Sequence, residues 1–222
     1  MNNYQPNSRR PIADLFRKTA HGAVRACIKL NIHPDAISYL SVVAALIGMN
    51  FFLNTGKHPN LLLYAPLFLY LRLYFNMLDG MVALESGKAS YRGEIINELP
   101  DRVSDVLIFV GVAHSGLMNP FLGYWVAICA LLVAYIGTLG DAVAGNREFG
   151  GVMAKQWRMM MLHLGSWATL GFIWWGGGDP HWAGLSLLDW TCILIIAGCV
   201  QTMIVRLRST LRLLKSQSEK KS

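Results

Sequence analysis

The sequence predicts an all-α integral membrane protein with six transmembrane helices preceded by an amphipathic interfacial helix. Of its 222 residues, 54% are hydrophobic and 15% are charged, whereas soluble domains have about 45–50% apolar and about 25% charged residues. Six segments are apolar enough and long enough for a span, which needs about 20 residues. The four cysteines show no paired or metal-ligand spacing. Together these features exclude a secreted disulfide scaffold, a disordered protein and a soluble two-domain enzyme.

The apolar segments account for most of the chain. They run over Asp35–Leu53, Leu61–Leu84, Gly93–Leu117, Phe121–Ala142, Met159–Trp175 and Leu187–Val205. We expect an N-terminal interfacial segment (1–33), a six-helix membrane domain (34–210) and a basic cytoplasmic tail (211–222). No separate soluble domain fits, so any chemistry must be carried out by the spans and their cytoplasmic ends.

The segment Pro11–Leu30 has the pattern of an amphipathic helix. Apolar residues recur at helical spacing, and basic residues such as Arg17 and Arg25 decorate the other side. Such a helix lies in the membrane interface, where it either takes part in function or serves only as an anchor. Pro34 then follows at a position suited to the start of the first span.

The basic residues predict the orientation in the membrane. Six precede the first span, two lie between the second and third, three lie between the fourth and fifth, and six follow the sixth, whereas the opposite side has only Lys57. The positive-inside rule places both termini in the cytoplasm, as an even number of spans requires. We expect a multi-pass protein of the bacterial inner membrane. Its formal charge of +7 serves topology and contacts with anionic lipids and requires no nucleic acid.

Polar side chains gather within the second and third spans, where charges are functional candidates by default. Two helix faces are defined by three-and-four spacing: Asn76, Asp79, Gly80 and Ala83 on one, and Gly93, Asn97, Asp101 and Asp105 on the next. Because the connecting segment is short, the two helices should be antiparallel neighbours that enclose an oxygen-rich pocket open to the cytoplasm. Such carboxylates repel one another without a cation, and Mg²⁺ prefers carboxylate, amide and phosphate oxygens. Metal and phosphate together suggest phosphoryl-type transfer.

A structural interpretation of the same residues is the alternative. They would then form a buried network of ion pairs, for instance Arg72 with Asp79 and Arg102 with Asp105. The number of polar atoms and their confinement to two faces favour the functional site.

Residues 76–101 also carry a longer pattern. The stretch Asn76-Met-Leu-Asp79-Gly80-Met-Val-Ala83-Leu84 is followed by eight residues and then by Gly93-x3-Asn97-x3-Asp101. It resembles the signature D-x2-D-G-x2-A-R-x8-G-x3-D-x3-D of the CDP-alcohol phosphatidyltransferase family, with the same spacing throughout. Pro34-Asp35-x2-Ser38 resembles that family's P-N-x2-T element.

The resemblance implies a homodimeric enzyme of phospholipid biosynthesis. It would transfer a substituted phosphate group from a CDP-alcohol, such as CDP-diacylglycerol, to an acceptor alcohol and release CMP. The implied ligands of one or two Mg²⁺ or Mn²⁺ ions are Asn76, Asp79, Asn97 and Asp101, with Asp105 or Glu98 as a further source of charge. Asp101 would also be the general base for the acceptor hydroxyl. Ser38, Gly80, Ala83 and Gly93 would surround the CDP group.

Three signature positions depart from the family pattern: Asn76 and Asn97 replace Asp, and Leu84 replaces Arg. The charge of the four ligands falls from −4 to −2, which balances one divalent cation instead of two. A catalytically weak or inactive homologue that binds CDP-lipid is therefore an alternative. A small transporter is less favoured, because the polar cluster lies near one face and no internal repeat is present.

Lys155 and Arg158 follow the fourth span on the expected cytoplasmic side, three residues apart. We expect them either to bind an anionic group of the acceptor or nucleotide, or simply to flank the membrane.

Overall fold

The structure is a computed structural model that describes residues 13–176, 178 and 181–219. Its elements are α1 (Ala13–Lys29), α2 (Pro34–Leu53), α3 (Leu61–Glu85), α4 (Tyr91–Ala113), α5 (Pro120–Ala144), α6 (Lys155–Trp174), β1 (His181–Trp182), β2 (Leu185–Ser186) and α7 (Leu187–Glu219). The predicted all-α architecture is confirmed in the described part of the chain, except for the small antiparallel hairpin β1–β2.

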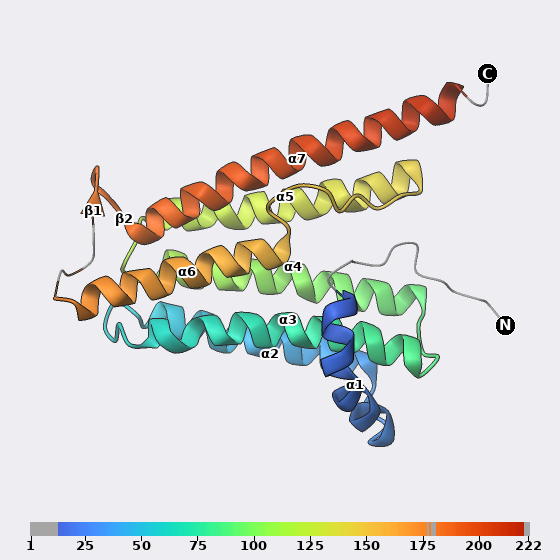
Figure 1. Cartoon of the computed structure of the whole chain (residues 1–222), viewed down its shortest axis with the longest axis horizontal. Coiled ribbons are helices and arrows are strands. Elements are labelled where there is room, and N and C mark those ends of the chain that lie inside the picture. Colours follow the sequence, from blue (N-terminus) through green and yellow to red (C-terminus); the bar gives the residue numbers. More distant parts are fainter. Residues whose placement is uncertain (1–12, 177, 179–180, 220–222) are drawn as a thin grey trace.

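Six long helices form a closed ring in which each packs against two neighbours, in the order α2, α3, α6, α7, α5, α4 and back to α2 (Figure 1). Fully buried apolar side chains fill its interior, among them Phe52, Leu69, Phe109, Leu162 and Ile195. Direct contact between α3 and α4 is more limited, because α2 packs against both of them. The expected neighbours therefore meet chiefly through their polar side chains.

Local sequence signals set the helix ends near the polar cluster. Pro34 begins α2, and the Ser90 hydroxyl caps α4 by accepting a hydrogen bond from the Gly93 amide at 3.0 Å. At its far end, α5 closes on Gly145, whose φ of 66° suits a residue without a Cβ. These caps set where α2, α4 and α5 begin or end, and thereby which residues lie at the polar end of the ring.

Several predicted boundaries shift. The third span was expected over Gly93–Leu117, but α4 begins at Tyr91 and ends at Ala113. The last helix continues past Val205 to Glu219, so the predicted tail is largely helical. The start of the N-terminal segment (residues 1–12) and the last three residues of the tail lie outside the described residues.

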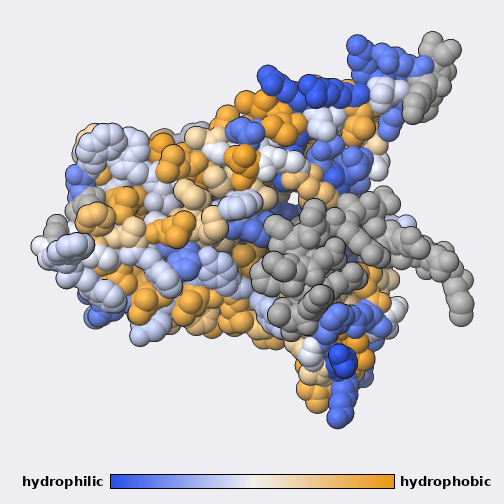
Figure 2. Space-filling model, in the orientation of Figure 1, coloured by the Kyte–Doolittle hydropathy of each residue, from blue (hydrophilic) through white to orange (hydrophobic). Residues whose placement is uncertain are grey.

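Four described helices, α2, α3, α5 and α7, are long and apolar enough to cross a membrane. The charges that α4 and the first turn of α6 carry make these two helices more polar. Figure 2 shows apolar side chains over much of the ring, with strongly polar ones around α1 and at the end of α7. The chain is thus a multi-pass membrane protein. Length and composition support four spans among the described helices, and not the six that were predicted.

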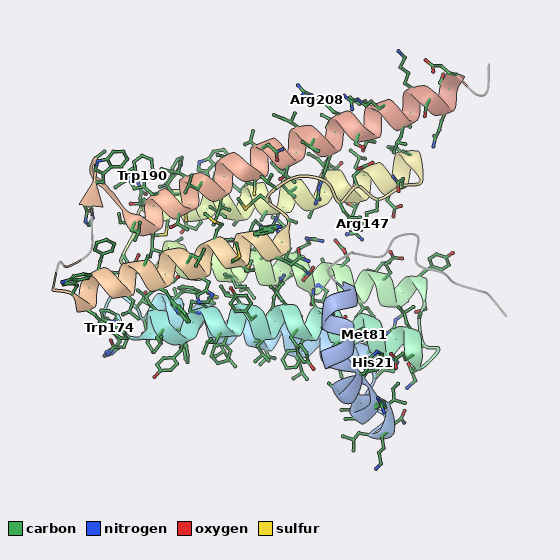
Figure 3. All side chains as sticks on the ribbon, in the orientation of Figure 1. His21, Met81, Arg147, Trp174, Trp190 and Arg208 are labelled. Carbon is green, nitrogen blue, oxygen red and sulfur yellow. The ribbon has the colours of Figure 1, made fainter. Side chains whose placement is uncertain are left out.

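The helix α1 lies across one end of the ring (Figure 1). Val24 is buried in a cluster with Ile37, Leu78 and Val82, and His21 lies 3.7 Å from the Glu85 carboxylate. The C-terminal end of α7 is at this same end of the molecule, and Trp174 is at the opposite end (Figure 3). The amphipathic helix is therefore packed against α3 beside Leu78 and Val82, close to Asp79 in the same helix.

Candidate active site

The structure brings the four signature side chains of α3 and α4 together. Asn97 of α4 donates from Nδ2 to Oδ1 of Asp79 at 2.6 Å. In the other direction, Asn76 of α3 donates from Nδ2 to Oδ1 of Asp101. Each carboxylate is thus linked to an amide of the opposite helix, at the place where the spacing predicted a shared pocket.

Asp79 is buried among neutral donors. Its side chain accepts hydrogen bonds from the Gly80 amide at 2.6 Å and from the Ser38 hydroxyl of α2, in addition to Asn97. Within the described part of the chain, no Lys, Arg or His forms an ion pair with it. An ionised carboxylate without an ion pair is disfavoured in a buried position, so a cation bound next to Asp79 would stabilise its charged form.

Asp101 is buried next to cations. Lys155, the first residue of α6, forms an ion pair with Oδ2, and Arg72 of α3 approaches Oδ1 at 2.8 Å. Arg72 also donates to the main-chain carbonyl of Asp101 at 2.8 Å. The two carboxylates of the motif thus differ sharply in electrostatic environment.

The contacts of Asp105 differ from those expected of a metal ligand. One turn beyond Asp101, it receives Arg72 on Oδ1 and Arg158 on Oδ2, each at 2.8 Å, and all three residues are at most 1% exposed. This geometry favours a structural role for Asp105, in a buried ion network that links α3, α4 and α6, rather than the expected role as a metal ligand. Arg158, expected at an anion site or at the membrane surface, is instead a buried member of this network that also reaches a pocket.

The specific ion pairs of the structural alternative are wrong. Arg72 pairs with Asp101 and Asp105 rather than with Asp79. Arg102 pairs with Glu98, its neighbour one turn earlier on α4. The cluster therefore contains both a structural ion network and, around Asp79, a group that this network does not neutralise.

A cavity of about 290 Å³ opens beside Asp79. Its lining includes the predicted Ser38, Gly80, Ala83, Gly93 and Asn97. A Cβ built on Gly80 would meet no atom within 4 Å, so the missing side chain leaves open space next to the carboxylate. We call this cavity the Asp79 pocket.

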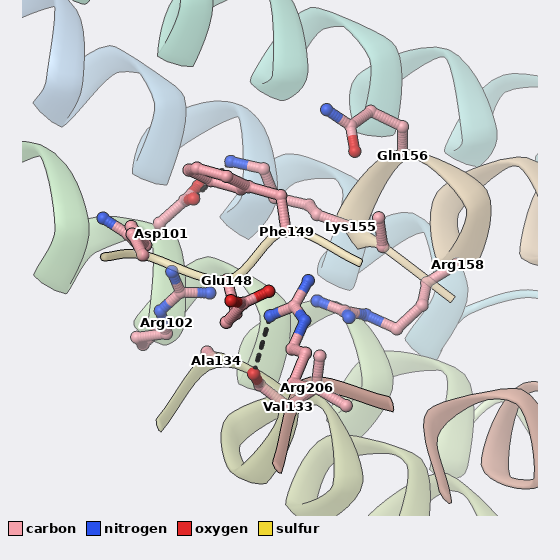
Figure 4. A pocket seen from close by; sticks show the side chains of 12 residues that line it. Asp101, Arg102, Val133, Ala134, Glu148, Phe149, Lys155, Gln156, Arg158 and Arg206 are labelled. Carbon is pink, nitrogen blue, oxygen red and sulfur yellow. Dashed lines mark hydrogen bonds and ion pairs between the residues drawn. The ribbon is translucent and has the colours of Figure 1, made fainter. Parts of the chain in front are cut away.

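A second cavity, of about 130 Å³, opens beside Asp101 (Figure 4), and we call it the Asp101 pocket. Its charged lining residues are Asp101, Arg102, Arg147, Glu148, Lys155, Arg158 and Arg206. Five cations thus face two carboxylates. Arg206 was counted only among the topology residues, because α7 is distant from the motif in sequence and no spacing relates them. Glu148 and Phe149 of the α5–α6 connection carried no sequence signal either.

Arg147 and Phe149 line both pockets and mark the boundary between them. Arg147 donates to the Glu98 carboxylate at 2.6 Å, and its guanidinium lies 5.7 Å from the centre of the Phe149 ring. The connection that carries them runs back from the end of α5 to α6 (Figure 1). The two pockets are therefore adjacent, with Asp79 in one and Asp101 in the other.

The donor set fits a hard divalent cation, although with little charge. Asn76 Oδ1 is buried and has no hydrogen-bond partner, which leaves an amide oxygen available close to Asp101. The described residues include no cluster of three or more His, Cys, Asp or Glu side chains suited to a metal. Two carboxylates and two amide oxygens remain, and these are oxygen ligands that Mg²⁺ and Mn²⁺ accept.

Comparison with known proteins gives a consistent result. Residues 31–204 match the family model described as CDP-alcohol phosphatidyltransferase. The inner membrane protein YnbA of Escherichia coli is 28% identical over 172 residues, covering 78% of this chain and 81% of YnbA. The phosphatidylinositol phosphate synthase of Cutibacterium acnes is 26% identical, covering 90% and 96% of the two chains.

Solved structures share the fold. The Mycobacterium tuberculosis phosphatidylinositol phosphate synthase with CDP-DAG bound aligns with a TM-score of 0.68 at 21% identity, over 85% of this chain and 92% of that one. The same enzyme in complex with manganese and citrate also aligns with a TM-score of 0.68, at 20% identity, over 86% and 88%.

Proposed function

The chain belongs to the CDP-alcohol phosphatidyltransferase family, and we propose that its acceptor is an alcohol that itself carries a phosphate group. The donor would be a CDP-activated lipid such as CDP-diacylglycerol, and CMP would be released in a step of phospholipid biosynthesis. The observation that carries the proposal is the pair of adjacent pockets, one beside Asp79, which has no ion pair in the described residues, and one lined by five cations.

The Asp79 pocket is suited to the CDP group. Gly80, Ala83 and Gly93 present little side chain there, so a nucleotide can approach the backbone. Asp79 and the amide oxygens of Asn76 and Asn97 would hold the divalent metal. When bound, Mg²⁺ or Mn²⁺ neutralises the pyrophosphate and the charge that develops on the departing CMP.

Asp101 is the proposed general base. The acceptor hydroxyl oxygen attacks the phosphorus that bears the lipid, the bond from that phosphorus to the CMP oxygen breaks, and the hydroxyl proton passes to the Asp101 carboxylate. Asp101 lines the cationic pocket, so an acceptor bound there would place its hydroxyl near this carboxylate. General-base catalysis of this kind contributes about 10²–10⁴-fold.

The cations of the Asp101 pocket favour an anionic acceptor. Arginine side chains pair well with phosphate through their planar donors, and a phosphate monoester would offset the excess of positive charge. Several relatives are named phosphatidylinositol phosphate synthases, which agrees with a phosphorylated polyol as the acceptor.

The membrane arrangement completes the proposal. We infer that α4 and α6 also cross the bilayer, because they close the ring with four apolar helices and bury much of their polar surface inside it. Both termini and the active site would face the cytoplasm of a bacterial inner membrane, and the chain would form a homodimer. The lipid part of the donor would enter from the bilayer, and the acceptor from the cytoplasm.

The test is CMP release by the purified protein with CDP-diacylglycerol and Mn²⁺. We expect release with inositol phosphate or glycerol phosphate and little with inositol or glycerol. Equal rates with the unphosphorylated alcohols would refute the acceptor assignment. No CMP with any pair of substrates would favour the non-catalytic CDP-lipid-binding homologue, which Asn76 and Asn97 make the second candidate. The D101N variant tests Asp101 as the base, and its rate of CMP release should be lower by about 10²-fold or more.

A further inference from the structure

The charges around the two motif carboxylates are distributed unevenly. Asp79 receives only neutral donors within the described part of the chain. Asp101 is in contact with two cations, Lys155 and Arg72. Where the family pattern has four carboxylates for two divalent ions, this chain has one carboxylate without an ion pair in the described residues and one that already pairs with two cations.

We propose that this active site holds one divalent cation, on the Asp79 side, and that the Lys155 ammonium takes the place of a second one at Asp101. The inference rests on the proposed function, whose donor brings the pyrophosphate. It assigns Lys155 a positioning role, which differs from its general contribution to an anion pocket.

The position of Lys155 suits this role. It is the first residue of α6, and its side chain is 9% exposed. The neighbouring turn of α6 is held in place by Arg158, which binds Asp105 and the Met153 carbonyl. The ammonium is therefore fixed against Asp101 from the side opposite Asn76, where it obstructs a metal ion that needs the same carboxylate.

The charge balance leads to the same number of ions. The cluster formed by Asp79, Asp101 and Asp105 with Arg72, Lys155 and Arg158 has no net charge. The pyrophosphate of a CDP-alcohol, with two diester phosphates, brings two negative charges, which one divalent ion neutralises. A second divalent ion at Asp101 would lie next to Lys155 and Arg72, which already pair with this carboxylate, and like charges in contact at a buried position are strongly unfavourable.

The experiment measures Mn²⁺ bound to the purified full-length chain in the presence of CDP-diacylglycerol. We expect one Mn²⁺ per chain at saturation, with the six-line electron paramagnetic resonance spectrum of an isolated ion. Two ions per chain, or the spectrum of an exchange-coupled pair, would overturn the proposal. D79N should lose the bound ion, and retention of that ion would place the site elsewhere and also overturn it.

Lys155 is tested in a background in which the family carboxylates are restored. N76D/N97D should still bind one strongly held ion, whereas N76D/N97D/K155M should bind two that are exchange-coupled. The matched control, N76D/N97D/K57M, removes an exposed lysine of the opposite end and should keep one ion. Two bound ions in N76D/N97D, or a single bound ion in N76D/N97D/K155M, would refute the role of Lys155.

The number of bound ions and the release of CMP test the two proposals separately. One isolated Mn²⁺ without CMP release would support the single-ion site and reject the transferase activity. CMP release with a coupled pair of ions would do the reverse.

Discussion

Asp105→Asn is expected to destabilise the protein strongly, because Asp105 neutralises two buried arginines. Each of its oxygens is 2.8 Å from a guanidinium, of Arg72 or Arg158, and neither arginine is more than 1% exposed. Removal of one partner of a buried ion pair costs about 3–5 kcal/mol. In a protein of this size each kcal/mol lowers the melting temperature by about 2–4 °C, so the expected loss is about 6–20 °C.

Thermal unfolding in detergent measures this loss. Cys129, Cys192 and Cys199 are buried, so a thiol-reactive fluorophore reports their exposure as the helices separate. The matched control is E219Q, which removes a carboxylate from an ion pair whose side chains are 80% and 67% exposed, and it should leave the melting temperature unchanged. If D105N melts within 2–3 °C of the control (about 1 kcal/mol), the ion network does not hold the three helices together as argued.

The same variant, D105N, distinguishes the structural role of Asp105 from its predicted role as a metal ligand. Below its melting temperature, D105N should bind Mn²⁺ with the wild-type stoichiometry, because both oxygens of Asp105 pair with arginines. A lost ion in the folded variant would restore Asp105 as a metal ligand.

Three further outcomes are expected. Gly165→Ala should destabilise the α6–α7 contact by about 1–3 kcal/mol, because the new Cβ would clash with the Thr191 hydroxyl. Gly171→Ala on the same helix would meet no atom within 4 Å and should be tolerated. Equal melting temperatures of the two variants would contradict the packing. Gly80→Val should keep the wild-type melting temperature but raise KM for the CDP-lipid, and an unchanged KM would remove Gly80 from the donor site. Arg206→Gln should raise KM for a phosphorylated acceptor more than KM for the donor, which steady-state CMP release measures; a reversed order would exchange the two pocket assignments.

The helices and the pairing of the motif residues were predictable from sequence because their signals are local. Apolar segments of span length identified the ring helices, and the four-residue spacing of Gly93, Asn97 and Asp101 placed them on one face. A short connection between α3 and α4 then required Asn76 and Asp79 to lie opposite. The structure confirms the ring helices and the meeting of these side chains, although only four of the described helices are long and apolar enough to span a membrane.

The ionic partners were not predictable in this way. Arg72 had several carboxylates within reach along the two spans, and sequence spacing does not choose between Asp79, Asp101 and Asp105. Arg158 and Arg206 come from helices far from the motif, so their part in the site depends on how the ring closes. The small hairpin β1–β2 was missed because two-residue strands have no periodicity to detect.

The sequence by itself determined that this is a helical membrane protein with two carboxylates and two amides facing each other on neighbouring helices, since hydropathy and helical repeat are properties of consecutive residues. Only the tertiary structure decided that Asp101 meets Lys155 and Arg72 while Asp79 meets neutral donors. That difference arises because α6 and α3 bring Lys155 and Arg72 to Asp101 of α4, whereas α2 brings the Ser38 hydroxyl to Asp79. The electrostatic field at a buried group is the sum over all the chain segments that fold around it, and no local pattern contains that sum.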